Sequence, residues 1–450
     1  MNQSSVLIEC AEVPDLIGLK ARFPQLYPAL LSSTAPGGKD GRFDLLLAGD
    51  GRALVQESGH CRAMGGADQT EGFVGGLRSW RQREAAQAAV GLPFRGGWLI
   101  YLGYEMAQCF EPSLALPGAD DGLPLALAVR TPAAVVVDRL RERAWLVAEA
   151  GAEAVLERIQ HSLTEAPREM ADEQFKCSLI AEDPPEHYRQ NVRRVIEYLH
   201  AGDVFQVNLS RGWRLATDAP AESVYRALMK ANPAPFSGWM SWNGADLISS
   251  SPERLLSVRN GRVQTRPIAG TRPRGADPDL DRQLLGELSS DPKERAEHIM
   301  LIDLERNDLG RVCVPGSVVV DEFCAIESYA HVHHIVSNVQ GRLGSGFDAL
   351  DALAAVFPGG TITGCPKIRC MQIIAELEQV GRGAYTGAMG YLGADGSLDM
   401  NILIRSMVLR EQVLKFRTGG GIVADSDPQR ELDETRAKAA GLLRALGVPC

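Results

Sequence analysis

Helical and β-type segments alternate along most of this 450-residue chain, and this alternation most limits the folds it can adopt. Apolar residues at helical spacing predict helices in residues 187–200, 283–288, 293–304, 348–356, 368–377 and 432–446. β-rich runs lie between them, in residues 204–211, 247–251 and 414–423. Because no internal repeat or heptad pattern is present, the sequence predicts sheets and helices interleaved in one fold.

The chain divides into two regions at a break near residues 182–185, Glu-Asp-Pro-Pro. Before it, short β-type runs at 44–48 and 133–137 precede a helix-like segment that begins at residue 152. We therefore predict an N-terminal region at 1–170 and a second region at 185–450.

Charge and composition exclude several classes of protein. The net charge is −10, and no dense Lys/Arg run is present, so a nucleic-acid or membrane-surface partner is not expected. No apolar stretch approaches the length of a membrane span, and no leader-like segment opens the chain, so we expect a cytoplasmic protein. The nine cysteines form no C-x-x-C pair, which argues against structural zinc or a disulfide framework.

Two pairs of glutamates stand out in the helical segments. Glu294 and Glu297 are three residues apart, as are Glu431 and Glu434, and this spacing places each pair on one helix face. Carboxylates from two facing helices suit a hard cation such as Mg²⁺. The alternative is two solvated helix faces, which is the common meaning of any single Glu-x-x-Glu.

Three turns are rich in glycine: residues 267–275, 361–367 and 418–421. Glycine lets backbone N–H groups approach an anion closely, and neighbouring Thr, Lys or Arg side chains add donors. None of these turns matches a phosphate loop or a dinucleotide-binding fingerprint. They predict carboxylate-binding turns, with an ordinary tight turn or bulge as the alternative for each.

Four isolated polar residues interrupt or end apolar β-type runs: Gln206, Glu253, His334 and Arg405. A buried polar group needs a partner, so each has either a structural partner in the core or a place in a shared site. No Ser-His-Asp arrangement or H-E-x-x-H motif is visible. From the residues alone, the chain is an enzyme candidate with acidic pairs and anion-binding turns.

Together these motifs resemble the family of chorismate-using enzymes, which includes anthranilate synthase large subunits, isochorismate and salicylate synthases and aminodeoxychorismate synthase component I. The resemblance runs in order from about residue 188 to 447, and it is weaker at 27–31, 41–44 and 97–105. Its motifs lie at 201–210, 251–253, 266–275, 296–298, 303–308 and 419–426. The resemblance implies one large α+β unit, a two-sheet antiparallel β-sandwich with helices packed outside and a site in a cleft.

The resemblance also implies a metal. It places Glu297 and Glu434 as direct Mg²⁺ ligands, while Glu294 and Glu431 bind water molecules on the metal. In the family this metal holds the ring carboxylate of chorismate, so chorismate is the expected substrate.

Further roles follow from the same resemblance. Glu253 matches the general acid that protonates the departing hydroxyl, and His334 matches the active-site histidine. The positions expected to border or hold the substrate are Gly270, Thr271, Thr361, Tyr385, Arg405, Gly419, Gly420 and Lys438.

Position 206 indicates the nucleophile. Water-using members of the family carry a lysine there as general base, whereas Gln206 cannot deprotonate water near neutral pH. Ammonia is nucleophilic as the free base, so amination is expected. A separate glutaminase subunit is expected to supply the ammonia from glutamine, since no glutaminase pattern occurs in the chain.

Two aminating reactions remain open. Motifs at 207–209, 234–237, 332–334, 362–364 and 419–421 are closer to aminodeoxychorismate synthases, which predicts 4-amino-4-deoxychorismate for 4-aminobenzoate and folate biosynthesis. Ala269 departs from that branch, because well-known members carry a nucleophilic lysine there and anthranilate synthases usually read Pro-Ile-Ala-Gly-Thr. Anthranilate formation is therefore the alternative, and a non-catalytic chorismate-binding subunit is a second one.

The resemblance also implies that the N-terminal region can hold tryptophan. Residues 30–33 read Leu-Leu-Ser-Ser, where feedback-inhibited anthranilate synthases read Leu-Leu-Glu-Ser. This departure argues against feedback control by a bound tryptophan.

Overall fold

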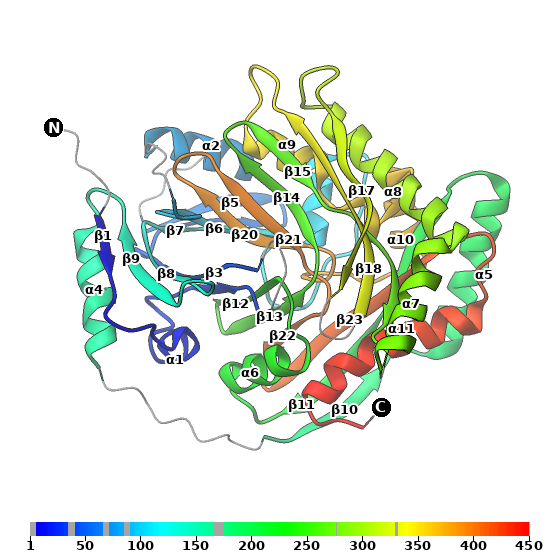
Figure 1. Ribbon diagram of the computed structural model, residues 1–450, viewed down its shortest axis with the longest axis horizontal. Coiled ribbons are helices and arrows are strands. Elements are labelled where there is room, and N and C mark those ends of the chain that lie inside the picture. Colours follow the sequence, from blue (N-terminus) through cyan, green and yellow to red (C-terminus); the bar gives the residue numbers. More distant parts are fainter. Residues whose placement is uncertain are drawn as a thin grey trace.

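The structure is a computed structural model, and it describes residues 6–34, 41–65, 72–84, 91–165, 175–275, 277–328 and 332–449. Two large antiparallel sheets form its centre, and helices surround them (Figure 1). The first sheet runs, in spatial order, β1 (Val6–Glu9), β9 (Arg143–Ala148), β8 (Ala133–Asp138), β3 (Phe43–Ala48), β2 (Ala29–Ser32), β12 (Phe236–Trp242), β13 (Ala245–Ser251), β22 (Ser406–Arg410), β23 (Val413–Ile422), β11 (Gln206–Thr217) and β10 (Cys177–Glu182), with β19 (Gly364–Cys365) paired to β11.

The second sheet begins beside the predicted site and ends at the N-terminal hairpin. Its spatial order is β16 (Ile268–Pro273), β18 (Val332–Arg342), β15 (Arg262–Thr265), β14 (Arg254–Arg259), β21 (Leu398–Ile402), β20 (Ala388–Gly393), β6 (Gly97–Leu102), β7 (Ala126–Thr131), β4 (Ala53–Glu57) and β5 (His60–Met64), with β17 (Val319–Ser328) paired to β18. The sequence regions 1–170 and 185–450 each contribute strands to both sheets.

One apolar cluster fills the space between the sheets. Leu45 and Leu47 of β3 meet Leu99 and Tyr101 of β6 in this cluster, whereas Leu46 points to the opposite face. This alternation is the two-residue period of a strand whose neighbouring side chains point to opposite faces. Because helices cover the outer faces, β3 and β6 are buried on both sides and read as nearly continuous apolar runs.

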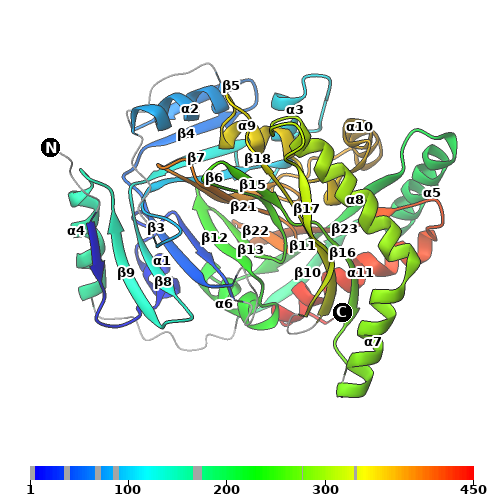
Figure 2. The same ribbon diagram turned by 45° about the horizontal axis from the view of Figure 1, so that its top comes forward.

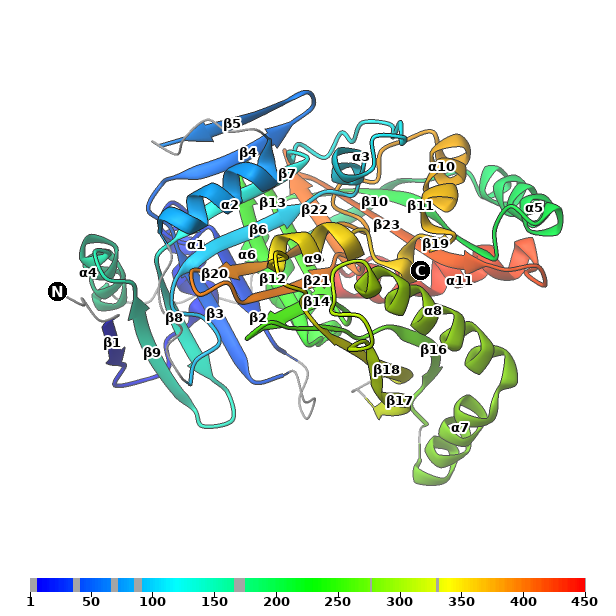
Figure 3. The same cartoon turned by 90° about the horizontal axis from the view of Figure 1, so that it is seen from above.

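The helices cover the two outer faces and one end of the sandwich (Figures 1 and 3). The apolar cluster on the first sheet's outer face includes residues of α1 (Leu16–Arg22), α4 (Glu153–Thr164), α6 (Ala221–Ala231) and α11 (Pro428–Ala445). The cluster on the second sheet includes residues of α2 (Phe73–Arg83), η1 (Tyr104–Met106), α3 (Ala107–Phe110), α8 (Pro292–Gly310), α9 (Ala349–Val356), η2 (Gly360–Ile362) and α10 (Lys367–Glu378).

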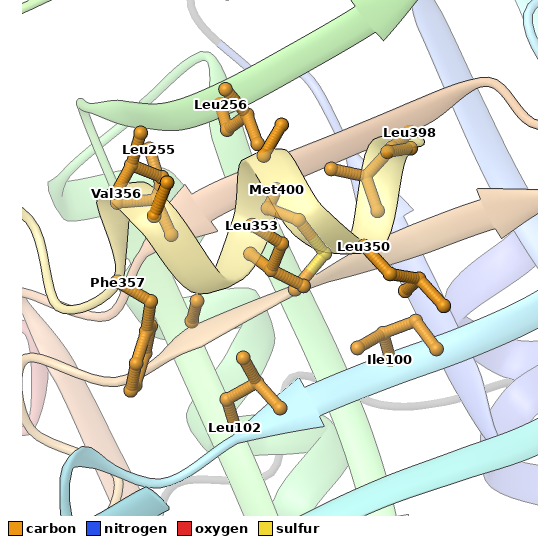
Figure 4. Packing of buried hydrophobic residues seen from close by; sticks show 14 of the residues in the cluster. Ile100, Leu102, Leu255, Leu256, Leu350, Leu353, Val356, Phe357, Leu398 and Met400 are labelled. Atoms are coloured by element: carbon orange, nitrogen blue, oxygen red, sulfur yellow. The ribbon is translucent and has the colours of Figure 1, made fainter. Parts of the chain in front are cut away.

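Helix α9 illustrates this outer packing. Figure 4 shows Leu350 and Leu353 directed from α9 toward Met400 of β21 and Ile100 of β6. Asp348 caps the helix by accepting hydrogen bonds from the N–H groups of residues 350 and 351. The cap starts the helix where its apolar face reaches the sheet.

A fourth apolar cluster packs α5 (Pro185–Ala201), α10 and α11 around β11 and β23. Helix α7 (Pro278–Ser290) precedes α8 and projects from the side of the molecule on which α8 lies (Figure 2). These elements carry most of the residues that the sequence analysis singled out.

The predicted fold class is confirmed. Every helix and strand predicted for the second region is present within a few residues of its expected bounds, from α5 to α11. No helix among the described residues is long and apolar enough to cross a membrane.

Candidate active site

Helix α11 presents the second glutamate pair beside strand β23. Asp427 caps this helix through the N–H groups of residues 429 and 430, and Pro428 occupies its first turn. A Cβ placed on Gly420 would lie 3.3 Å from Glu431 Oε2 and 3.5 Å from Glu434 Oε1. Both carboxylates therefore lie against the backbone of the triple glycine.

Helix α8 presents the first pair from another side. Glu294 forms an ion pair of 3.1 Å with Arg272, and its Oε2 would lie 3.1 Å from a Cβ on Gly270. Glu297 Oε1 accepts a hydrogen bond of 3.2 Å from the Gln206 side-chain amide. The first pair thus contacts β16 and the start of β11.

Gln206 joins the two acidic pairs through the triple glycine. Its Nε2 would lie only 2.1 Å from a Cβ on Gly421, so a side chain at 421 would have no room. Gly420 lies beside Glu431 and Glu434, and the adjacent Gly421 lies beside the amide that holds Glu297. No three Asp, Glu, His or Cys side chains among the described residues lie close enough together to hold a metal ion. The four glutamates supply carboxylate oxygens, the donor type that Mg²⁺ takes, and they form two separate pairs, with Glu431 and Glu434 beside Gly420 and Glu294 beside Gly270.

Glu253 lies in a buried corner at the other end of the site. It is 4% exposed, and its Oε1 accepts a hydrogen bond of 2.9 Å from the Thr361 hydroxyl. Burial, with a smaller contribution from the nearby Glu305 carboxyl, raises the pKa of Glu253 to about 8, although Thr361, the Ile268 N–H and Arg405 favour the charged form. Glu253 therefore carries a proton at neutral pH, as a general acid requires.

His334 and Arg405 lie next to this corner. Burial, with the Arg405 charge as the next cause, lowers the pKa of His334 to about 4, so its ring is neutral at neutral pH. Nδ1 lies 3.2 Å from the Gly270 carbonyl oxygen and must donate to it, because a carbonyl only accepts. Arg405 has a φ of 50° in the turn between β21 and β22, a left-handed conformation that costs energy and is frequent at functional sites.

The structure places Ala269 and Thr271 in the backbone register next to His334. Ala269 pairs with Ile335 and is 8% exposed, and Thr271 pairs with His334 across a register shift. The Thr271 side chain lies outside the described part of the structure, so its role beside the ring stays a prediction.

Tyr385, Gly419 and Lys438 form a third contact group. A Cβ on Gly419 would lie 2.7 Å from the Tyr385 hydroxyl and 2.4 Å from the Leu209 carbonyl oxygen. Lys438 Nζ donates a hydrogen bond of 2.8 Å to the Gly419 carbonyl and pairs with Glu434 at 2.7 Å. A cation, a buried phenol and the glycine backbone thus lie together, and the amino and hydroxyl groups are donors that suit a carboxylate.

The predicted site residues whose side chains are described are therefore linked into one continuous set. One run of contacts leads from Glu253 and Thr361 through Arg405, His334 and Gly270 to Glu294. A second run leads from Glu297 through Gln206 and the triple glycine to Glu434, Lys438 and Tyr385. Helix α8 joins the two runs, because it carries both Glu294 and Glu297. These residues come from both sheets and from α8 and α11, which explains why their convergence could not be read from spacing.

A buried network that the sequence analysis missed supports the Tyr385 side. Arg382 forms an ion pair of 2.6 Å with Glu378, and its guanidinium lies 5.6 Å from the Tyr385 ring centroid. Glu378 also accepts from the Ser210 N–H at 2.8 Å and pairs with Arg417 at 3.2 Å. The signal in the sequence was an arginine between two glycines, at 381–383, which by itself indicates only a turn.

Asn208 was also not singled out as a site residue. Its Oδ1 is buried without a hydrogen-bond partner and would lie 3.0 Å from a Cβ on Gly419. An unsatisfied buried acceptor beside Gly419 is available to a ligand that donates a hydrogen bond.

A cavity of about 1780 Å³ lies elsewhere, lined by α1, residues 9–15 and the turn between β12 and β13. None of the predicted site residues lines it. In the proposed tryptophan segment, Ser32 accepts from the Tyr225 hydroxyl at 3.0 Å and the Ser33 N–H donates to Asp44. A tryptophan site there stays a prediction.

Comparisons with known proteins identify the family of the chain. The family model described as "chorismate binding enzyme" matches residues 34–444. Anthranilate synthase component 1 of Aquifex aeolicus is 36% identical over 98% of this chain and 94% of its own length. Aminodeoxychorismate synthase component 1 of Bacillus subtilis is 42% identical over 78% of this chain and 77% of its own. The crystal structure of anthranilate synthase component I from Streptococcus pneumoniae superposes with a TM-score of 0.80 and 32% identity, over 89% of this chain and 92% of that one.

Proposed function

Because the chain belongs to the family of chorismate binding enzymes, we propose that it aminates chorismate and releases 4-amino-4-deoxychorismate and water. The observation that carries this proposal is the buried Glu253 carboxyl, which retains its proton to a pH of about 8 through its pKa. Loss of a ring hydroxyl needs a proton donor, because hydroxide is a poor leaving group.

Glu253 would give its proton to the departing hydroxyl oxygen as the carbon–oxygen bond breaks. Thr361 donates to Oε1 and fixes the carboxyl orientation. The carboxylate that remains faces Arg405, whose charge offsets it until a proton is regained. General acid catalysis of this kind contributes roughly 10²–10⁴-fold to rate.

Gln206 favours ammonia over water as the nucleophile. Its amide donates to Glu297 and cannot remove a proton, so this position activates no water molecule. Ammonia attacks as the free base and loses a proton afterwards. Mildly alkaline pH should therefore help until Glu253 ionises.

The other residues would bind and orient the substrate. Lys438 and Tyr385, which meet at Gly419, suit one carboxylate, and Arg405 suits nearby oxygens. Glu297 and Glu434, supported by Glu294 and Glu431, would hold Mg²⁺, which supplies positive charge for the second carboxylate when it is bound.

A glutaminase subunit is the proposed source of ammonia in the cell. Both the Aquifex aeolicus and the Bacillus subtilis relatives are named component 1, which supports a second component. The product would then serve 4-aminobenzoate and folate biosynthesis after a separate lyase acts.

Anthranilate formation is a second candidate, and Ala269 favours it. Ala269 carries no nucleophile, so a covalent route through this position is closed to the chain. The Aquifex aeolicus and Streptococcus pneumoniae relatives are named as anthranilate synthases. In favour of aminodeoxychorismate are the five motifs given above and the Bacillus subtilis relative.

Product identification distinguishes the candidates. The purified chain is incubated with chorismate, Mg²⁺ and ammonium at mildly alkaline pH, with and without aminodeoxychorismate lyase, and products are separated by chromatography. We expect 4-aminobenzoate only when lyase is present. Anthranilate without lyase would replace our proposal with the second candidate.

A matched pair of variants makes the assay specific. Glu253→Gln should reduce product formation by roughly 10²–10⁴-fold. Glu376→Gln, a change on α10 whose carboxylate accepts from the Tyr198 hydroxyl, should not reduce it. Chorismate binding without turnover in the wild type, with ammonium and Mg²⁺ both present, would instead indicate a non-catalytic binding subunit.

A further inference from the structure

A second group of buried charges lies behind Glu253. Glu305 and Asp308, both on α8, are 5% and 3% exposed. Lys367, at the start of α10, pairs with Asp308 at 2.5 Å and donates to the Val356 carbonyl at 2.8 Å. None of these three side chains has a role in the mechanism above, although their segments belong to the motifs at 303–308 and 361–367.

The short helix η2 connects this group to Glu253. Its residue Thr361 donates to Glu253, and the preceding Gly360 N–H favours the charged form of Glu305. A Cβ on Gly360 would lie 2.4 Å from Leu304 Cδ2 and 3.5 Å from Glu305 Oε1, so α8 packs directly on this backbone. Two adjacent residues of η2 thus contact the two carboxyl groups, Gly360 that of Glu305 and Thr361 that of Glu253.

The charges in this corner do not balance if every group is ionised. Three carboxyl groups, Glu253, Glu305 and Asp308, face two cations, Lys367 and Arg405. An uncompensated buried charge is costly, so the corner is most stable when one carboxyl keeps a proton. Lys367 pairs directly with Asp308 and its charge also attracts Glu305. Arg405 is the smallest of the influences that act on Glu253, so the charged form of Glu253 is the least compensated and Glu253 carries the proton.

We propose that Glu305, held beside the Asp308–Lys367 ion pair, is a positioning residue that keeps one proton on Glu253. The protonation state of Glu253 would then depend on the balance of all the buried charges in the corner rather than on Glu253 alone. The proposal rests on the proposed function only for its catalytic meaning, since the location of the proton is a property of the ligand-free protein.

The other groups that face this corner are few. Arg311 attracts Asp308 from a half-exposed position, the Cys365 thiol lies near Asp308, and His334 lies beside Arg405. His334 is neutral at neutral pH because burial lowers its pKa to about 4. Burial also raises the pKa of Glu305 to about 7, with Asp308 adding to the rise and Lys367 opposing it. Arg311 is 53% exposed and pairs with Glu111 at 3.5 Å, so this pair adds no net charge to the corner.

Infrared spectroscopy of the ligand-free enzyme tests the proposal directly. The carbonyl band of a protonated buried carboxyl is followed against pH, and Glu253→Gln identifies the band of Glu253. In Glu305→Gln, which removes one negative charge without changing shape, we expect that band to disappear at a pH lower by about one unit. The matched control is Asp303→Asn, an exposed change on the same helix, which should leave the band unmoved.

A second variant changes the charge of the corner in the opposite direction. Lys367→Gln removes a cation, so the corner should retain two protons and a second protonated-carboxyl band should appear near neutral pH. A band of Glu253 that titrates unchanged in folded Glu305→Gln, or no added band in folded Lys367→Gln, would overturn the proposal. If one variant does not fold, the other still decides.

The activity assay provides a separate reading. The alkaline limb of the kcat/KM profile should move to lower pH in Glu305→Gln by the same amount as the infrared band. If the band moves as expected but no amination of chorismate is found in the wild type, the proposed function fails while the charge count stands.

Discussion

At the Glu253 end of the candidate site the carboxyl groups are buried, whereas at the end between α8 and α11 they reach solvent. Glu253 and Glu305 are 4% and 5% exposed, while the Glu434 side chain is 50% exposed and that of Glu294 is 23% exposed. Burial penalises charge and keeps a proton on Glu253, but Lys438 and Arg272 accompany the more exposed glutamates as charged partners. One residue type would thus supply both the proposed acid and the proposed cation ligands, and the surroundings of each carboxyl determine which role it can take.

The largest effect should come from removing the acid. Glu253→Gln keeps the shape of the side chain and its bond to Thr361 but removes the transferable proton, so kcat should fall by roughly 10²–10⁴-fold. Calorimetric titration should show the affinity for chorismate within a few-fold of wild type. A variant with near-normal kcat would show that the buried end does not donate the proton.

The next effect should come from the solvent-exposed end. Glu434→Gln removes a proposed Mg²⁺ ligand, and the Mg²⁺ concentration for half-maximal activity should rise by about 100-fold. Asp433→Asn, an exposed neighbour that bonds to Gln429, is the matched control and should leave the Mg²⁺ dependence unchanged. Equal Mg²⁺ dependence in the two variants would remove α11 from the metal proposal.

The difference in burial should also appear in how the free energy of unfolding depends on pH. The pKa of Glu253 rises from 4.5 unfolded to about 8 folded, so between these values the folded state binds more protons. The stabilising difference is complete below pH 4.5 and is lost as the pH rises through about 8. Each unit of pKa difference is worth at most about 1.4 kcal/mol.

Urea unfolding at pH 5.5 and pH 8.5 measures this loss. Glu253→Gln should lose about 2 kcal/mol less than wild type between the two values, because an amide does not ionise. Glu434→Gln should follow the wild-type curve within error. If Glu253→Gln lost as much unfolding free energy as wild type between the two pH values, another group would be responsible for the loss.

The sequence predicted the fold and singled out most residues of the candidate site, because local patterns carry that information. Helix α11 was predicted from apolar spacing in residues 432–446, and the Asp427 cap starts it earlier, at Pro428. Glu431 and Glu434 fall on one face because they are three residues apart in a helix. Ordered motifs then identified Glu253, His334 and Arg405 through the family resemblance.

What the sequence could not provide was three-dimensional convergence. The proximity of Glu305 to Glu253 depends on α8 packing against η2, and their segments are separated by about fifty residues. The Glu378–Arg382–Arg417 network likewise joins a helix end, a turn and a strand that share no motif. Such contacts arise from tertiary packing, which spacing along the chain does not encode.

A third buried carboxyl sharpens the comparison and should give the smallest effect on turnover. Glu105 is 2% exposed, and burial raises its pKa to about 7, close to the value for Glu305. It lies outside the set of residues that would contact the substrate and instead accepts from the N–H groups of Arg382 at 2.6 Å and Gly383 at 3.1 Å. Glu105 therefore holds the turn that leads into Tyr385.

Glu105→Gln keeps one acceptor oxygen and places an amide donor against a backbone donor, which should reduce unfolding stability by ~1–3 kcal/mol. Loosening the turn should raise KM for chorismate a few-fold through Tyr385, while kcat should stay within about two-fold of wild type because no proton of Glu105 is transferred. Glu57→Gln, a partly exposed change at the β4–β5 turn, serves as the control. Steady-state kinetics with urea unfolding separate the two parameters. A fall in kcat comparable to that of Glu253→Gln would mean that burial alone makes a carboxyl catalytic here, whereas an effect confined to KM and stability would show that contact with the reacting atoms is also required.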